Sequence, residues 1–130
     1  MKAMPMLHTT DPAKEIWQRV GDLKDIDIFG NYVLLGIYER PEQLKSGLYI
    51  SDGTRKEDQY QGKSALVLKK GPNAFVSDDA YDFKGQNVEP GDWVAIFVSD
   101  GRKVVVRKQL CRLVEDVHIR MRVASPDCVY

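Results

Sequence analysis

Histidine and cysteine, the usual ligands of zinc, are scarce in this chain of 130 residues. The two histidines are His8 and His118, and the two cysteines are Cys111 and Cys128. The sequence contains no Cys-x-x-Cys or His-x-x-x-His spacing and no glycine-rich phosphate loop. Nucleophilic catalysis also needs a base and an orienting group beside the nucleophile. We therefore expect neither an enzyme nor a bound metal or cofactor.

Net charge and long apolar runs are also lacking. Nineteen acidic residues balance nineteen basic ones, so no overall field draws the chain to nucleic acid or to a membrane surface. No apolar run approaches the roughly 18 residues that cross a bilayer, and residues 1–7 do not resemble a secretory signal. A reducing cytoplasm is the expected compartment, although the spacing of Cys111 and Cys128 leaves a disulfide open. Cys111 on its own is expected to be buried rather than reactive.

A short helix is predicted near the N-terminus, over residues 11–20. Asp11-Pro12 favours a helix start, because aspartate caps helices and proline suits the first helical position. Apolar residues then recur at helical spacing, at Ile16, Trp17, Val20 and Leu23. A helix of two or three turns is not stable alone in water. Trp17 must therefore dock on the rest of the chain or on a neighbouring subunit.

Short apolar runs separated by glycine, proline and aspartate make up most of the remaining sequence. Residues 89–92 predict a type II turn, and residues 99–102 predict a tight hairpin. Strands are expected over residues 32–38, 64–68, 93–98, 104–106, 110–114 and 117–123. In a chain of single-domain length, this pattern indicates an all-β barrel or sandwich.

An apolar triplet lies inside a polar segment rich in turn formers, residues 40–61. Leu48, Tyr49 and Ile50 follow Gly47 directly. An apolar triplet held in solvent costs free energy unless it has a partner. The pattern alone leaves two interpretations open: a loop that binds a partner, or a short strand that returns to the core.

Three basic residues share one face of the last predicted strand: His118, Arg120 and Arg122. A solvated outer face is favoured over a grip on an acidic partner or on phosphates. No aromatic platform is interleaved with these bases in the sequence, so nucleic-acid binding is not expected.

Six features follow one another in a fixed order between Asn31 and Val123. They are Tyr32-Val33-Leu34-Leu35, Gly47-Leu48-Tyr49-Ile50, Gln61-Gly62-Lys63-Ser64-Ala65-Leu66-Val67-Leu68, Gly71-Pro72-Asn73, Val88-Glu89-Pro90-Gly91-Asp92-Trp93-Val94 and Leu113-Val114-Glu115-Asp116-Val117-His118-Ile119. In order and spacing, the chain resembles the GroES co-chaperonin family, especially the diverged members encoded by bacteriophages. The resemblance implies a partly open β-barrel and a ring of seven subunits. It also implies that the apolar triplet is a mobile loop that docks on a chaperonin.

The chain departs from the family pattern at several places. Tyr49 stands in the triplet where the family has small aliphatic residues, and one glycine precedes the triplet where the family often has two. Residues 1–29 form an added N-terminal extension and residues 124–130 an added tail. A shared fold does not fix a function. The alternative is a bacteriophage virion component, such as a capsid decoration protein built on the same fold.

The resemblance divides the chain into an extension, a barrel domain over residues 30–123, and a tail. Within the barrel domain, residues 40–61 are the expected docking loop, and residues 72–88 are an excursion that corresponds to the family's roof hairpin. The predicted core is Val33, Leu35, Leu66, Leu68, Trp93, Val94, Ile96, Val104, Ile119 and Met121.

A homo-oligomer is expected, because a small open barrel leaves strand edges that invite pairing. The last strand is predicted to pair with a neighbour's first strand, with Trp17 as an aromatic anchor. The expected subunit interface is Trp17, Tyr32, Val33, Ile119, Met121 and Val123. The expected partner is a chaperonin in the bacterial cytoplasm or, for the alternative, capsid protein in the virion.

Overall fold

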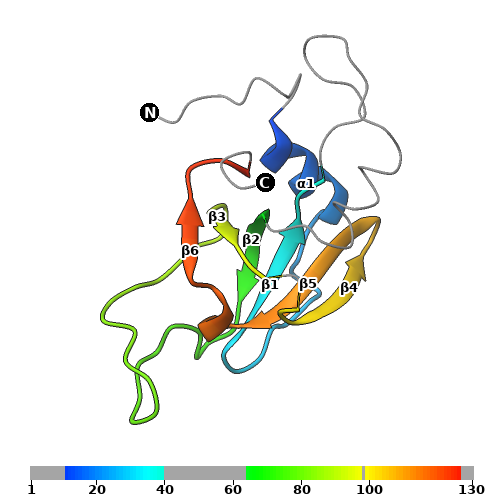
Figure 1. Cartoon of the computed structure of the whole chain (residues 1–130). Helices are drawn as coiled ribbons and strands as arrows, with labels where there is room; N and C mark the ends of the chain where they lie inside the picture. The colour runs from blue at the N-terminus through cyan, green and yellow to red at the C-terminus, as the bar shows by residue number, and fades with distance from the viewer. Residues whose placement is uncertain (1–10, 40–63, 98, 127–130) are drawn as a thin grey trace.

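The computed structural model describes residues 11–39, 64–97 and 99–126, which form a six-stranded antiparallel sheet with one short α-helix (Figure 1). The strands lie in the order β4-β5-β1-β2-β3-β6. The elements are α1 (Pro12–Val20), β1 (Tyr32–Ile37), β2 (Ser64–Lys70), β3 (Trp93–Ala95), β4 (Arg102–Val106), β5 (Gln109–Glu115), the 3₁₀ turn η1 (Asp116–His118) and β6 (Met121–Val123). The predicted all-β class with a short N-terminal helix is confirmed. Within the described residues, no helix is long and apolar enough to cross a membrane.

Helix α1 begins and ends where its capping residues predict. The Asp11 carboxylate accepts a hydrogen bond of 3.0 Å from the Ala13 N–H. Gly21 follows the last helical residue with a φ of 66°, a conformation that glycine adopts without strain. The buried face of α1 carries Ile16 and Val20, which pack against the sheet.

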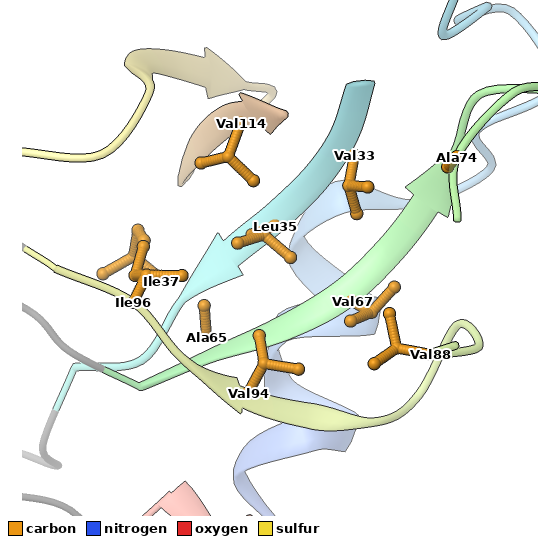
Figure 2. Packing of buried hydrophobic residues seen from close by; sticks show 10 residues of the cluster. All are labelled: Val33, Leu35, Ile37, Ala65, Val67, Ala74, Val88, Val94, Ile96 and Val114. Atoms are coloured by element: carbon orange, nitrogen blue, oxygen red, sulfur yellow. The ribbon is translucent and has the colours of Figure 1, made fainter. Parts of the chain in front are cut away.

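The two central strands, β1 and β2, are buried on both faces. Side chains that alternate along them therefore join two separate clusters. The first cluster gathers on one face of the sheet (Figure 2) and consists of Val33, Leu35, Ile37, Ala65, Val67, Ala74, Val88, Val94, Ile96 and Val114. The second cluster lies on the other face, with α1, and consists of Ile16, Val20, Leu34, Tyr38, Leu66, Leu68, Trp93, Val106 and Cys111.

Cys111 is fully buried in the second cluster, as predicted. Burial raises the pKa of its thiol to about 11, because the charged thiolate loses its hydration. The thiol therefore stays protonated at neutral pH, which suits a packing role and not a reactive one.

Most of the predicted core is confirmed, and three positions differ. The buried members are Val33, Leu35, Leu66, Leu68, Trp93, Val94 and Ile96. Ile119 is partly buried and packs against the first cluster. Val104 and Met121 are wrong as core positions, since they are 38% and 51% exposed. They lie on β4 and β6, the two outermost strands of the sheet, where one neighbour is missing.

The hairpin predicted at residues 99–102 is wrong in its pairing. The chain does turn there, and Gly101 takes a φ of 69°. However, β4 pairs with β5 and not with β3, which lies between β2 and β6. The tight turn lies instead between β4 and β5, where Arg107 has a φ of 47°. The turn at residues 89–92 is confirmed, with Gly91 at a φ of 100°.

The continuous strand predicted over residues 117–123 is also wrong. Residues 116–118 form η1, and only Met121–Val123 pairs with β3. The turn is held by reciprocal capping, in which the Glu115 N–H donates to His118 Nδ1 at 3.3 Å. The alternating pattern is therefore interrupted by a local bond that the periodicity does not reveal.

Candidate docking site

The predicted docking residues Gly47, Leu48, Tyr49 and Ile50 lie outside the described residues. The structure does describe the two strand ends that bound residues 40–63. The Tyr38 N–H donates to the Ser64 carbonyl at 3.0 Å, so the segment leaves and rejoins the sheet at neighbouring positions. These two residues form the base of the segment.

The base is held by packing and by hydrogen bonds to three other parts of the chain. Tyr38 is only 1% exposed, and its ring meets Trp93 edge-on with centroids 5.9 Å apart. The Ser64 hydroxyl donates to the Pro126 carbonyl at 2.8 Å. The Gln109 amide donates to the Ile37 carbonyl at 3.0 Å. Strands on either side and the C-terminal segment therefore all hold the base in place.

A second feature is the excursion, residues 72–88, which projects from the sheet beside β6 (Figure 1). An aromatic cluster holds it together: Phe83 lies 5.4 Å from Phe75 and 4.6 Å from Tyr81 between ring centroids. The sequence pattern did not predict that these three aromatics meet. Their presence in an otherwise polar segment is the signal that could have indicated it.

Asp116 fastens the excursion to the start of β1. Its side chain is 3% exposed and accepts from the Asn31 amide at 3.1 Å and from the Phe75 N–H at 3.0 Å. Its own N–H donates to the Asn31 carbonyl at 3.0 Å. Phe75 has a φ of 62°, which is unusual for a residue with a side chain. The carboxylate thus stabilises a strained turn where the excursion leaves the sheet.

We expect Asp116→Ala to lower the free energy of unfolding by about 1–2 kcal/mol, because it leaves the part-buried N–H of Phe75 and the Asn31 amide without acceptors. Asp116→Asn retains one acceptor oxygen and should cost less. Urea unfolding measures both changes. Equal stability of the alanine variant and the wild type would contradict the fastening role.

A groove of about 630 Å³ lies between the excursion and residues 117–122. Tyr81 and Phe83 contribute aromatic surface to it, and Met121 is one of its exposed apolar residues. The predicted basic face contributes Arg120 and Arg122. The structure therefore brings aromatic and basic side chains together where the sequence showed no interleaving.

Arg120 and Arg122 each form an ion pair with an aspartate of the same chain. Arg120 donates to the Asp100 carboxylate at 3.1 Å and stacks 4.5 Å from the centroid of Phe97. Arg122 lies 3.6 Å from the Asp92 carboxylate and is 61% exposed. His118 is half-buried by its capping bond, so the interpretation of a solvated face holds for the two exposed arginines and not for the histidine.

The structure corrects the predicted manner of subunit pairing. β1 is paired along both edges within its own sheet, with Leu34 opposite Leu113 and Gly36 opposite Leu66. Val33 is fully buried, so neither it nor the backbone of Tyr32 offers a free strand edge to a neighbour. A further pairing would require one of these bonds to break.

The other predicted interface residues lie at different places. Ile119 and Met121 line the groove, and β6 is an outer strand of the sheet as expected. Trp17 and Val123 are half-buried and pack against the second cluster of the same chain.

Neither a known family model nor a curated protein matches this chain. The base of residues 40–63 and the groove are the features from which we propose a function.

Proposed function

We propose that the chain is a co-chaperonin-like ring subunit that docks on a chaperonin through residues 47–50 and assists the folding of client proteins. The observation that supports this most directly is the base at Tyr38 and Ser64. A segment of 24 residues, 40–63, is inserted between two strand ends that are hydrogen-bonded to each other. A long insertion on a rigid base is a common way to present a binding segment.

In this proposal, the apolar triplet supplies the side chains that the chaperonin would bury. Burying one aliphatic side chain is worth about 1.5–3 kcal/mol. Ordering a flexible loop costs about 1–2 kcal/mol for each residue fixed, so a single loop binds weakly. Several copies on one ring offset this cost, because each docked loop raises the effective concentration of the next. The proposal therefore requires both the triplet and an assembly of subunits in the bacterial cytoplasm.

Ile50→Ser tests the docking role. We expect this variant to lose most of its chaperonin binding as a ring, because every copy loses one apolar contact. Its melting temperature should stay within a few degrees of the wild type. The matched control is Ser51→Ala, a change of polarity at the next residue, which should bind as the wild type does. Binding is measured by surface plasmon resonance on immobilised chaperonin with ATP.

Chaperonin binding and melting temperature together can also contradict the proposal. A wild-type chain that never binds a chaperonin, together with a large fall in melting temperature for Ile50→Ser, would make the triplet a core or lattice contact. The alternative of a virion structural protein would then take its place. Mass spectrometry of purified virions separates the two, because a decoration protein stays with the particle and a co-chaperonin does not.

A further inference from the structure

The groove beside β6 is lined by bases and by no acid. Its three charged residues are Lys84, Arg120 and Arg122. Lys84 makes no ion pair with any residue in the described parts of the chain. Arg120 pairs with the buried Asp100, whereas the pair of Arg122 with Asp92 is partly exposed, and such pairs exchange partners at little cost. The groove therefore offers positive charge beside apolar and aromatic surface.

The tip of the excursion, residues 77–82, has the opposite character. It carries three aspartates and no base, with Tyr81 52% exposed. Side-chain bonds fix its shape: Asp78 accepts from the N–H groups of Ala80 and Tyr81 at 2.8 and 2.9 Å, and Asp82 accepts from the Lys84 N–H at 2.8 Å. A preformed turn loses little entropy when it binds.

Asp78 and Asp79 of the tip do not line the groove of their own chain, whereas Tyr81 does. Asp78 and Ala80 border a separate hollow with Gly30 and Asn31 at the start of β1. Among the described residues, Asp79 makes no ion pair. Asp79 and Lys84 thus lie in one excursion, and neither makes an ion pair within the described residues.

We propose that the acidic tip of one copy docks in the basic groove of the next copy. This inference rests on the proposed ring, because a contact between two different surfaces of identical chains propagates head to tail and closes when the rotation permits. Charge complementarity carries the choice of occupant: Asp78 and Asp79 of the tip are acidic, and the groove offers Lys84 beside the two arginines. The contact also gives Ile119 and Met121 the interface role that their sequence pattern predicted, without strand pairing at β1.

Two single charge reversals test the contact by sedimentation velocity. Asp79→Lys alters the tip and leaves the groove intact, whereas Lys84→Glu alters the groove and leaves the acidic tip intact. Lys84 already has a φ of 55°, so glutamate there adds no new backbone demand. Each variant alone should self-associate at least about tenfold more weakly than the wild type. The matched controls are Asp27→Lys and Lys24→Glu, which make the same charge changes at exposed sites beside other hollows.

Mixing the two variants gives the sharper result. The intact tip of the Lys84→Glu chain should enter the intact groove of the Asp79→Lys chain, and the reversed tip and the reversed groove also carry opposite charges. An equimolar mixture should therefore associate more tightly than either variant alone. The proposal is overturned by a wild type that stays monomeric, by variants that associate as tightly as the controls, or by a mixture that associates no more tightly than either variant alone. If the chain binds a chaperonin as a ring and neither reversal weakens its assembly, only this contact is overturned. Charge-dependent assembly without chaperonin binding overturns the proposed function alone.

Discussion

Ile16→Ala is expected to lower the free energy of unfolding by about 2–5 kcal/mol, the range for removing a large aliphatic side chain from a packed core. Ile16 is 1% exposed and lies in the second cluster. It fits against Gly36 of β1, where an added Cβ would come within 2.7 Å of the Ile16 Cγ2. No other side chain on α1 is placed to fill the space left above Gly36, since Val20 is one turn away.

Three basic side chains hold the segment around α1 on the sheet. Arg19 donates to Gln109 at 2.7 Å, and Lys69 donates to the Leu23 carbonyl at 3.0 Å. Arg107 donates to the Val20 carbonyl and pairs with the Asp25 carboxylate at 2.7 Å. The hydrogen bond from Arg107 lowers the pKa of Asp25 below its ordinary value. These contacts position the helix, and burial of its apolar face supplies the stability.

Urea unfolding checks the effect of Ile16→Ala. The matched control is Gln18→Ala, on the exposed face of the same helix, which should change stability by less than about 0.5 kcal/mol. Similar stability of the two variants would mean that α1 is only loosely attached. In that event, residues 1–29 would be an appendage, as their description as an added extension suggests.

The sequence predicts α1, β1 and β2 well because their signals are local. Asp11, Pro12 and Gly21 set the ends of the helix through bonds within one turn of the chain. The runs in β1 and β2 are apolar at almost every position, and such runs require burial on both faces wherever the strands lie.

The outer strands are predicted poorly because exposure depends on position in the sheet. Val104 and Val105 look like core residues, yet they are 38% and 68% exposed, because β4 has no neighbour on its outer side. Residues 99–102 signal a turn correctly, but a turn does not decide which strand the chain meets next. Arg112 of β5 donates to the carbonyls of Phe97 and Asp100 at this turn, a contact between residues 12 and 15 positions apart that the local pattern does not reveal.

The groove could not be predicted either, for a related reason. Its walls come from Phe83 and Lys84 on one side and from Arg120 and Met121 on the other, more than thirty residues later. Neither stretch is a motif alone, and the bonds of Asp116 and the hydrogen bond from Arg122 to the Asn87 carbonyl hold them together. The docking role of residues 47–50 stays a prediction, since the segment lies outside the described residues.

Arg112 is the buried charge that joins β5 to the segment after β3. It is 3% exposed and donates to the carbonyls of Phe97 and Asp100 at 3.3 and 3.2 Å. Burial lowers the pKa of its guanidinium, and the nearby Asp100 carboxylate opposes that shift. Asp100 itself accepts from the Phe97 N–H at 2.9 Å and from Arg120 at 3.1 Å. One arginine therefore anchors the turn on which Arg120, at the groove, also depends.

Arg112→Ala is expected to lower the free energy of unfolding by about 3 kcal/mol, because it removes a buried bond to the Asp100 carbonyl and a part-buried bond to the Phe97 carbonyl, and opens a cavity. Arg112→Met keeps most of the volume and removes only the hydrogen bonds, so its loss should be about half as large. Urea unfolding of both variants separates the two causes. A methionine variant as stable as the wild type would show that the cost of burying the guanidinium cancels its hydrogen bonds, as happens for some buried ion pairs. The arginine would then be retained for the position of Asp100 and Arg120, and Arg112→Met should weaken the self-association of the chain while leaving its stability unchanged.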